Sequence, residues 1–352
     1  MVVALGSGKG GVGKTTLALA LADRLCAQGH VVTLVDAHLG GQSLAVVLSE
    51  NPGQSIPAGH FRKPVSVSSH PESGGLLQLV TVCDAASDPD AEEDGNLAAR
   101  LINSLRRLRS DLVIIDLGPG NAPFTLDCFL AADLGVLVTT PEPLAVRGAF
   151  RFLEACLVHG LRRKAQGRPE AQRLLRFLRK RGGEDATLRQ LLAGFNNGRH
   201  CLNSLLEELL HQLRVGIVVN CVREEADRRV GQTLRAMVLD FLGVHAELWG
   251  YVPFQREMRR LGGTIGAAGT WAAQLFDGCL DPLTSMVELA KYGLRPDWRH
   301  QTLLPHGRPN GRQVMCSIKC ECWSSCRLRR GGYPCRITPL GELKTLANEL
   351  AE

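Results

Sequence analysis

Short runs of apolar residues recur along the chain and alternate with longer segments in which apolar residues return every three or four positions. The short runs have the length of buried strands, and the longer segments have the period of helices. Continuous apolar strands separated by helices predict an α/β fold, in which a mostly parallel twisted sheet is flanked by helices on both faces. Strands are expected at Val2–Leu5, Val31–Val35, Leu77–Val82, Leu112–Ile115, Leu134–Val138, Val215–Val219 and Glu247–Gly250, with helices at Thr15–Gln28 and Asn96–Leu108 among others.

Three stretches break this alternation. Residues 50–75 are rich in Pro, Ser and Gly and predict a long surface loop. Residues 156–214 fall between a helix and a strand and have a helical, basic pattern. The tail from about residue 270 onward carries a cluster of cysteines and ends in a short helical pattern.

Nine residues near the N-terminus carry the strongest chemical signal. The segment GKGGVGKTT satisfies the phosphate-loop pattern G-x-x-x-x-G-K-[ST], with an expected strand before it and an expected helix after it. Backbone N–H groups of such a loop bind phosphate oxygens, while Lys14 reaches the β- and γ-phosphates and the Thr15 hydroxyl ligates Mg²⁺. A Gly-rich turn without a ligand is the alternative interpretation. The residues expected to bind the nucleotide here are Gly8, Gly10, Gly11, Val12, Gly13, Lys14, Thr15 and Thr16.

A carboxylate further along the chain completes the expected site. In DLVIIDLGPG, residues 111–120, an apolar strand ends at Asp116, which has the form of a Walker B strand. Asp116 would then lie at the strand tip beside the phosphate loop, where it can hold the hydration shell of Mg²⁺. Gly118 and Gly120 allow a switch segment whose N–H groups approach a γ-phosphate. Alternatively, Asp116 caps the helix that follows.

The phosphate loop contains a further lysine, Lys9, which phosphate binding does not require. With KGGVGK, the loop resembles that of the MinD/ParA family of ATPases, and the segment around Asp116 resembles MinD-like and FlhG-like members. The resemblance covers roughly residues 1–265, except for the segment 156–214. In that family the lysine at this place reaches across a nucleotide-sandwich dimer, so the resemblance implies an ATP-dependent homodimer and a catalytic role for Lys9.

Around residue 36 the sequence follows the family pattern and then departs from it. In VDAHLGGQSL, Asp36 matches the first aspartate, so Thr15, Asp36 and Asp116 are the implied Mg²⁺ set. His38 stands where the family has the aspartate that positions the attacking water. Histidine accepts a proton near neutral pH but is not a permanent carboxylate. Besides Lys14 and Asp116, His38 is therefore a catalytic candidate, and hydrolysis is expected to be weak or impaired; an exposed histidine without a role is the alternative.

Two later segments extend the resemblance. TTPEPLAVRGAF, residues 139–150, matches the family's TPEP segment but has Gly148 where an aspartate is expected near the dimer interface. VGIVVNC and LWGYVPF resemble the adenine-binding edge, which implies that Asn220 pairs with the base and that Pro253 lies on the closing loop. The family's connection at 156–214 is much shorter, so this segment is interpreted as a helical basic insertion within an ATP-binding domain of residues 1–269, followed by an extension of residues 270–352.

Composition and charge narrow the setting. The chain has 352 residues, of which 45% are apolar and 22% charged, which is typical of a globular protein. It has no N-terminal leader pattern and no apolar run that would span a bilayer, so a cytoplasmic location is expected, at the surface of a membrane or nucleoid. Residues 161–181 contain nine Lys or Arg and one Glu. Such a strip attracts nucleic acid or anionic membrane; an acidic protein partner and a solvated helix are the alternatives.

Five of the twelve cysteines gather in the C-terminal extension, at residues 316–335. In a reducing compartment such a cluster favours a metal over disulfides. Four thiolates suit zinc or an iron–sulfur cluster, although the spacing has no CxxC pair and free thiols stay open. The candidate ligands are Cys316, Cys320, Cys322, Cys326 and Cys335.

Together these patterns predict an ATP-binding, slowly hydrolysing protein of the MinD/ParA type. It would dimerise on ATP and position or regulate a cellular partner, as in pole, flagellar, division or DNA-segregation systems. Two alternatives stand beside it: a carrier or assembly ATPase for metal clusters like the Mrp/Nbp proteins, and a scaffold that binds ATP with impaired hydrolysis.

Overall fold

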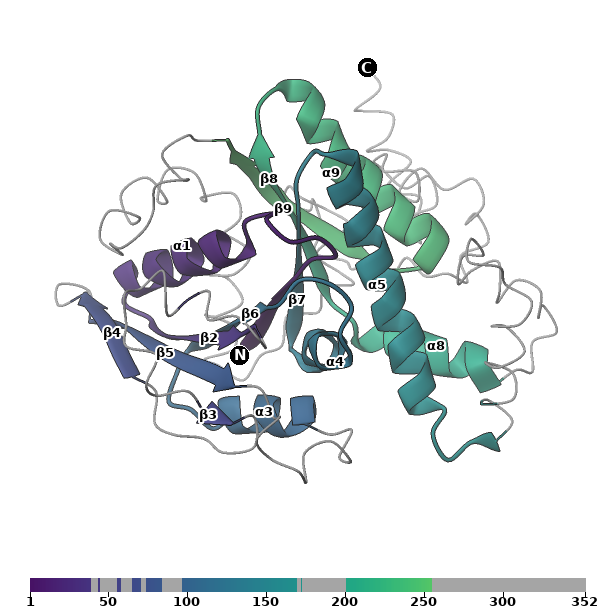
Figure 1. The fold of residues 1–352 in the computed structure, drawn as a ribbon, viewed down its shortest axis with the longest axis horizontal. Helices are drawn as coiled ribbons and strands as arrows, with labels where there is room; N and C mark the ends of the chain where they lie inside the picture. The colour runs from purple at the N-terminus through teal and green to yellow at the C-terminus, as the bar shows by residue number, and fades with distance from the viewer. Residues whose placement is uncertain are drawn as a thin grey trace, which may run out of the picture.

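A computed structural model describes residues 1–38, 44, 56–57, 65–70, 74–83, 97–169, 172 and 201–254. Figure 1 shows their strands gathered into a sheet with helices packed against it. In chain order the elements are β1 (Val2–Gly6), α1 (Lys14–Ala27), β2 (Val31–Ala37), β3 (Ile56–Pro57), β4 (Val65–His70), β5 (Gly75–Cys83), α3 (Leu97–Leu105), β6 (Leu112–Leu117), α4 (Pro123–Ala131), β7 (Leu134–Thr139), α5 (Pro143–Lys164), α8 (Cys201–Gln212), β8 (Val215–Val222), α9 (Glu225–Met237), a π-helix η3 (Val238–Leu242) and β9 (Ala246–Pro253).

The strands lie across the sheet in the order β3-β5-β2-β6-β1-β7-β8-β9, and β4 pairs with β5. Every described pair is parallel except β4–β5, which is antiparallel. The first strand therefore lies inside the sheet, between β6 and β7, and the chain leaves it towards β2. Because the strands are parallel, the segments that follow β1, β2, β6, β7 and β8 collect at one edge, which is where such sheets bind ligands.

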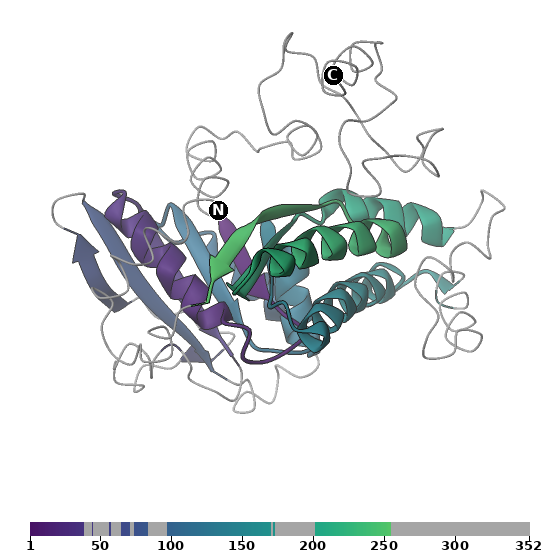
Figure 2. The same cartoon turned by 90° about the horizontal axis from the view of Figure 1, so that it is seen from above.

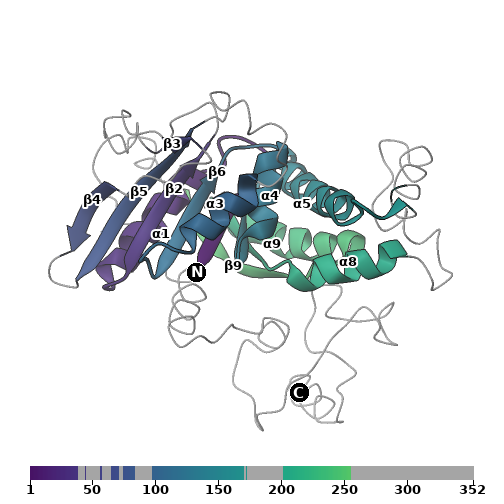
Figure 3. The ribbon, with the colours of Figure 1, turned by 90° about the horizontal axis from the view of Figure 1, so that it is seen from below.

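Alternate residues of the strands enter two apolar layers. In β1, Val3 and Leu5 pack in the layer that includes α1, whereas Val2 and Ala4 pack in the layer formed with α3, α4, α5, α8 and α9. Figure 3 shows α3 and α4 across the strands from α1, and Figure 2 shows α5 alongside α8 and α9. Both faces of the strands are buried, which explains why they appear in the sequence as continuous apolar runs.

The predicted fold class is confirmed, and the expected strands are all present, longer than predicted by one to four residues. The long loop expected at residues 50–75 is wrong, because Ile56–Pro57 and Val65–His70 form strands β3 and β4. β4 pairs antiparallel with β5 through a register shift between Ser66 and Ser68. β4 contains several serines, and this loop-like composition is why the sequence pattern did not predict the strand.

Both ends of the segment 156–214 pack into the main domain. Residues 156–164 are the second half of α5, where Leu157 and Leu161 are buried in the core. At the other end α8 packs on α5, and a Cβ at Gly160 would lie only 2.9 Å from Leu209 Cδ2. An inserted segment would therefore be shorter than expected. Its centre, residues 173–200, lies outside the described residues. The predicted domain boundary at residue 269 and the tail also lie outside them.

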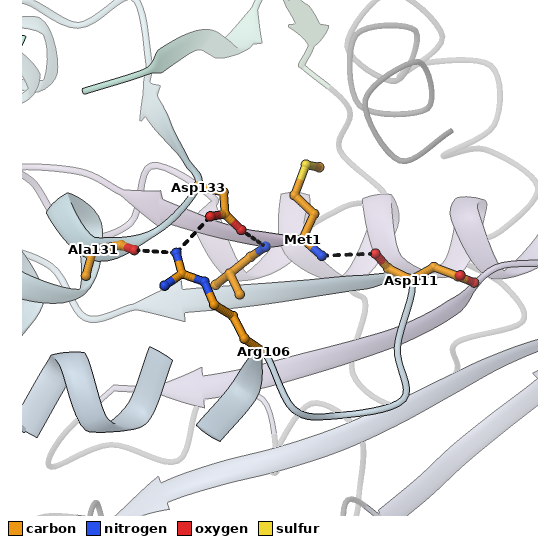
Figure 4. A network of polar contacts seen from close by, with 6 residues as sticks. Met1, Arg106, Asp111, Ala131 and Asp133 are labelled. Carbon is orange, nitrogen blue, oxygen red and sulfur yellow. Dashed lines mark hydrogen bonds and ion pairs between the residues drawn. The ribbon is translucent and has the colours of Figure 1, made fainter. Parts of the chain in front are cut away.

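At the amino ends of the strands, one carboxylate ties several segments together (Figure 4). Asp133 Oδ2 accepts the N–H of Val2, at 2.8 Å, and Asp133 Oδ1 accepts from Arg106 Nη2, at 2.7 Å. Arg106 also donates to the carbonyl of Ala131, at 3.1 Å. Asp133 thus joins the start of β1, the start of β7 and the segment after α3, at the opposite edge from the phosphate loop.

Replacing Asp133 tests whether the stability of the fold depends on these bonds. Asp133→Ala leaves the Val2 N–H without its partner, so we expect the free energy of unfolding to fall by about 1–3 kcal/mol. Arg106→Ala is the matched control, because it breaks a partly exposed ion pair and an exposed hydrogen bond to the Ala131 carbonyl but leaves the Val2 N–H bonded, and it should cost less than about 1 kcal/mol. Urea unfolding with an unchanged m-value measures both. Equal losses in the two variants would contradict the role given to Asp133.

Candidate functional site

The phosphate loop joins β1 to α1 at the carboxyl edge of the sheet. Gly11 and Gly13 have φ of 77° and 90°, a region that residues with a Cβ rarely adopt. Gly13 is the N-cap of α1, and no side chain of the described residues caps this helix. The N–H groups of the first turn therefore face the loop without an internal acceptor, which is the arrangement that binds anions.

Lys14 lies folded inside the loop. Its Nζ donates to Ser7 Oγ at 2.8 Å, and Ser7 Oγ donates to the carbonyl of Lys9 at 2.8 Å. The side chain is only 7% exposed, and burial lowers the pKa of Lys14 while Asp116 opposes this shift. Ser7 also accepts the N–H of Gly120 at its carbonyl, at 3.2 Å. The sequence reasoning missed Ser7, although a polar residue between a buried strand and a phosphate loop is a usable signal.

Two carboxylates and a hydroxyl meet beside Lys14. The register of β2 and β6 places Asp36 opposite Asp116, and both are 1% exposed. The Thr15 hydroxyl donates to Asp116 Oδ2 at 2.6 Å. Burial raises the pKa of Asp116 to about 6, with Asp36 adding to the rise and Thr15 and Lys14 opposing it. The site therefore holds more negative charge than its described surroundings neutralise.

Asp116 carries the observation that indicates a cation. Its Oδ1 is buried and has no hydrogen-bond partner in the described part of the chain. Hard cations such as Mg²⁺ take carboxylate, hydroxyl and water oxygens as ligands. The oxygens of Thr15 and Asp116, with Asp36 next to them, therefore fit Mg²⁺ and its water shell.

Asp36 also holds the segment that follows β2. Its Oδ1 accepts the N–H of His38 at 3.2 Å, and its Oδ2 accepts the N–H of Leu44 at 2.9 Å. The ring of His38 lies against Gly118, since a Cβ built on Gly118 would be 3.3 Å from His38 Cδ2. The segments expected as first and second switches thus meet at His38 and Gly118. The catalytic role of His38 stays a prediction.

The start of α5 presses directly on the phosphate loop. A Cβ on Gly8 would lie 1.9 Å from the carbonyl oxygen of Gly148, and a Cβ on Gly148 would lie 3.5 Å from Lys9 Cβ. The approach therefore requires a glycine at position 8, whereas a Cβ at position 148 would only be in close contact with the loop. Gly148, where the family resemblance expects an aspartate, is therefore in contact with the loop. Lys9 itself is exposed, and its side chain is accessible from outside the loop.

The expected adenine edge lies at the ends of β8 and β9. Asn220 is 6% exposed, and its Nδ2 donates to the carbonyl of Val12 at 2.8 Å. Pro253 ends β9, where it is exposed and pairs with Val222. The structure therefore brings Asn220 to the phosphate loop and places Pro253 at the next strand end. Their contacts with a base stay predictions.

The remaining sequence candidates fall mostly outside this site. The five tail cysteines lie beyond the described residues, and within the described residues no group of three His, Cys, Asp or Glu could hold a metal. In the basic segment, Arg163 pairs with Asp127 and Lys164 pairs with Glu208. No helix in the described part of the chain is long and apolar enough to cross a membrane.

The geometry defines the class: a parallel sheet with a phosphate loop after β1 and a carboxylate at the tip of β6 is a P-loop NTPase. Residues 1–162 match the family ParA, described as NUBPL iron-transfer P-loop NTPase. The similarity to this family thus covers residues 1–162, which is just under half of the chain.

Relatives with two different names match part of the chain. The iron-sulfur cluster carrier protein of Escherichia coli K12 is 29% identical over 150 residues, which cover 41% of this chain and 40% of that protein. The putative septum site-determining protein MinD of Chlorella vulgaris is 30% identical over 165 residues, covering 46% of this chain and 57% of that protein. The chain thus spans well under two thirds of either relative.

Solved structures of similar shape have lower identity. The MinD cell division protein of Aquifex aeolicus has a TM-score of 0.47 and 18% identity, with 81% of this chain and 96% of that chain covered. The septum site-determining protein MinD of Pyrococcus horikoshii OT3, complexed with Mg-ADP, has a TM-score of 0.49 and 17% identity, with 80% and 95% covered.

Removing the loop lysine tests the site directly. Lys14→Ala removes a cation from beside the phosphates, so we expect Mg-ATP binding to weaken by about 2–4 kcal/mol, roughly 30- to 1,000-fold. Lys164→Ala is the control, because it removes a lysine on α5 that pairs with Glu208. Calorimetric titration measures the affinities. If Lys14→Ala binds ATP as well as the parent does, the site is wrongly placed.

Proposed function

We propose that this protein is an ATP-dependent switch that binds Mg-ATP, dimerises around it and hydrolyses it slowly. One observation carries the proposal: Lys14, Thr15 and Asp116 meet at the carboxyl edge of the sheet, and one buried Asp116 oxygen has no partner among the described residues. A cation, a hydroxyl and a carboxylate in this arrangement match the charges of a nucleotide triphosphate and its metal. The ParA family match over residues 1–162 supports the same proposal.

Nucleotide binding would use groups that the fold already holds in place. The open N–H groups at the start of α1 would donate to the phosphate oxygens, and Lys14 would exchange its bond with Ser7 Oγ for bonds to the β- and γ-phosphates. Mg²⁺, held by Thr15 and through water by Asp36 and Asp116, would neutralise charge on the same phosphates. The metal ion, rather than the nucleotide, would therefore offset the carboxylate charge at this edge.

Dimerisation is proposed to depend on Lys9. The side chain of Lys9 is exposed, while Lys14 is buried, so the loop directs one lysine inwards and one outwards. In the MinD/ParA family the lysine at this place reaches the phosphates of the partner protomer. An outward lysine beside the bound phosphates can join two protomers only while the triphosphate is present, which makes the dimer a switch.

A single substitution separates binding from assembly. Lys9→Ala should still bind ATP but stay monomeric in sedimentation experiments, because the cation that contacts the partner's phosphates is lost. The parent should sediment as a dimer with ATP and as a monomer with ADP. Lys164→Ala should behave as the parent does. A Lys9→Ala protein that dimerises with ATP would remove Lys9 from the interface.

Hydrolysis is proposed to be slow because of His38. The ring of His38 lies beside Gly118, at the point where the two switch segments meet. A carboxylate there would orient a water molecule and stabilise its developing positive charge, whereas a neutral imidazole offers only a lone pair. Nucleotide binding does not involve this position.

The kinetics of His38 variants decide its role. If a carboxylate is what the site lacks, His38→Asp should accelerate ATP turnover, and a tenfold gain would correspond to about 1.4 kcal/mol of barrier. If His38 is itself the base, His38→Ala should abolish turnover and His38→Asp should not accelerate it. Steady-state rates of the three proteins distinguish the two cases. Identical rates in parent, Asp and Ala proteins would show that His38 takes no part in hydrolysis.

A second candidate function is a carrier for iron–sulfur clusters that uses the same ATP site. Several relatives are named iron-sulfur cluster carrier protein, and the matched family is described as an iron-transfer P-loop NTPase. The cysteines at residues 316–335 would supply thiolate ligands for the cargo. Zinc at these thiolates would instead be a structural site.

Metal analysis separates the two functions. A carrier purified without oxygen should show visible absorption and equal amounts of iron and sulfide, lost when Cys320 and Cys326 are replaced together by Ser. Replacing Cys26 and Cys128, which are buried in the core and belong to no metal group in the described residues, is the control. Zinc alone would contradict the carrier function, and a metal-free folded protein would rule out the metal site.

The setting of the switch follows from the same features. The proposed ATP-binding domain is residues 1–269, and the extension is residues 270–352. A cytoplasmic location is proposed, with the basic strip 161–181 contacting nucleic acid or an anionic membrane. Because Arg163 and Lys164 are already paired with carboxylates, such contact would depend on the other basic residues of the strip.

A further inference from the structure

The end of β8 has an unusual backbone that turns back towards the phosphate loop. Cys221 has φ of 60°. In the described part of the chain, every other residue with a positive φ is a glycine. The pairing of β8 with β9 is also irregular here, with a register shift between Val219 and Val222. For a residue with a Cβ this conformation costs about 1 kcal/mol or more, so it persists where surrounding contacts hold it.

The strained residue orients the side chain before it. The N–H of Cys221 donates to Asn220 Oδ1 at 2.9 Å. Because the carboxamide oxygen faces this N–H, the Nδ2 group faces the opposite way, towards the loop. There it donates to the carbonyl of Val12 at 2.8 Å. With Asn220 6% exposed, these bonds fix the amide in a buried position where neither partner is replaced easily by water.

The loop is shaped to receive this amide. A Cβ built on Gly13 would lie 2.1 Å from Asn220 Nδ2, so the side chain fills the space that Gly13 leaves. Gly13 is also the N-cap of α1 and directly precedes Lys14. Asn220 therefore contacts two consecutive loop residues, Val12 and Gly13, at the point where the loop becomes the anion-binding helix.

We propose that Asn220, oriented by Cys221, is a positioning residue that holds Val12 and Gly13 in the phosphate-binding form of the loop. The inference rests on the proposed nucleotide binding and assigns Asn220 to the phosphate part of the ligand. A loop held in its bound conformation before the ligand arrives binds more tightly, because it loses less conformational entropy on binding. Recognition of the base by the same amide is the competing role, and the two make opposite predictions for a ligand without a base.

Tripolyphosphate provides that ligand. Asn220→Asp keeps the shape and the oxygen that accepts from Cys221, but it sets a carboxylate oxygen against the Val12 carbonyl. We expect the affinities for Mg-ATP, Mg-GTP and magnesium tripolyphosphate to fall by a similar factor, about tenfold, which corresponds to about 1.4 kcal/mol. Tyr251→Phe is the matched control, because it removes one hydrogen bond on β9, from Tyr251 to Arg228, without touching the loop.

Two substitutions of Cys221 test the orientation. Valine is branched at Cβ and opposes a positive φ, whereas glycine adopts it freely. Cys221→Val should therefore lower tripolyphosphate affinity as Asn220→Asp does, and Cys221→Gly should lower it less. If Cys221 only filled space, Cys221→Gly should lower the affinity more than Cys221→Val does, since glycine removes more of the side chain. Thermal unfolding confirms that each variant is folded, and if Asn220→Asp is not, Asn220→Ser replaces it.

The outcomes are distinct. A variant that loses ATP affinity but keeps tripolyphosphate affinity would overturn the proposal and support base recognition by Asn220. Unchanged affinities for all three ligands in Asn220→Asp would overturn it as well. A parent protein that binds none of the three would overturn the proposed function, and the positioning role with it. A common loss for all three ligands, with Cys221→Gly milder than Cys221→Val, would support the proposal.

Discussion

Two buried carboxylates, Asp36 and Asp116, lie side by side at the carboxyl edge of the sheet, and the groups around them stabilise their negative charge. The parallel register of β2 and β6 sets Asp36 opposite Asp116. Taking one carboxylate out of water is costly, and placing a second beside it is more so. Asp36 receives two backbone N–H groups, and Asp116 receives the Thr15 hydroxyl and the field of Lys14. Asp116 Oδ1 has no hydrogen-bond partner among the described residues, and a bound cation would complete this balance.

The same constraint explains why the phosphate loop is held from several sides. A loop that carries Lys14 and the start of α1 helps the carboxylates only if it stays close to them. The backbone of Gly120 donates to Ser7, the start of α5 presses against Gly8, and Asn220 donates to Val12. Gly8 and Gly13 lie at two of these contacts, because a Cβ at either position would clash with Gly148 or Asn220. The loop is thus a packed part of the domain from which Lys9 projects outwards.

The sequence predicted the sheet and the loop well, because both depend on local patterns. Buried parallel strands are continuous apolar runs, and the phosphate loop has fixed spacing. The predictions were wrong where composition and structure disagree. β4 is rich in serine and resembled a loop, while the end of α5 was assigned to a basic insertion although its apolar face is part of the core. The contact of Asn220 with Val12 joins residues 208 positions apart, and no local pattern indicates it. Ser7 was missed because its role depends on where Lys14 folds.

The two departures from the MinD/ParA pattern contact different segments. His38 contacts Gly118 in the segment after β6, and Gly148 of α5 contacts Gly8 of the phosphate loop. Neither position takes part in the bond from Lys14 to Ser7 or in the bond from Thr15 to Asp116. The groups proposed to hold phosphate and metal are therefore kept, whereas the changed residues contact neighbouring segments. We propose that changes at these contacts alter hydrolysis and assembly rather than nucleotide capture. In that case a switch and a cargo carrier could share one nucleotide site, and the residues that distinguish them would lie outside it.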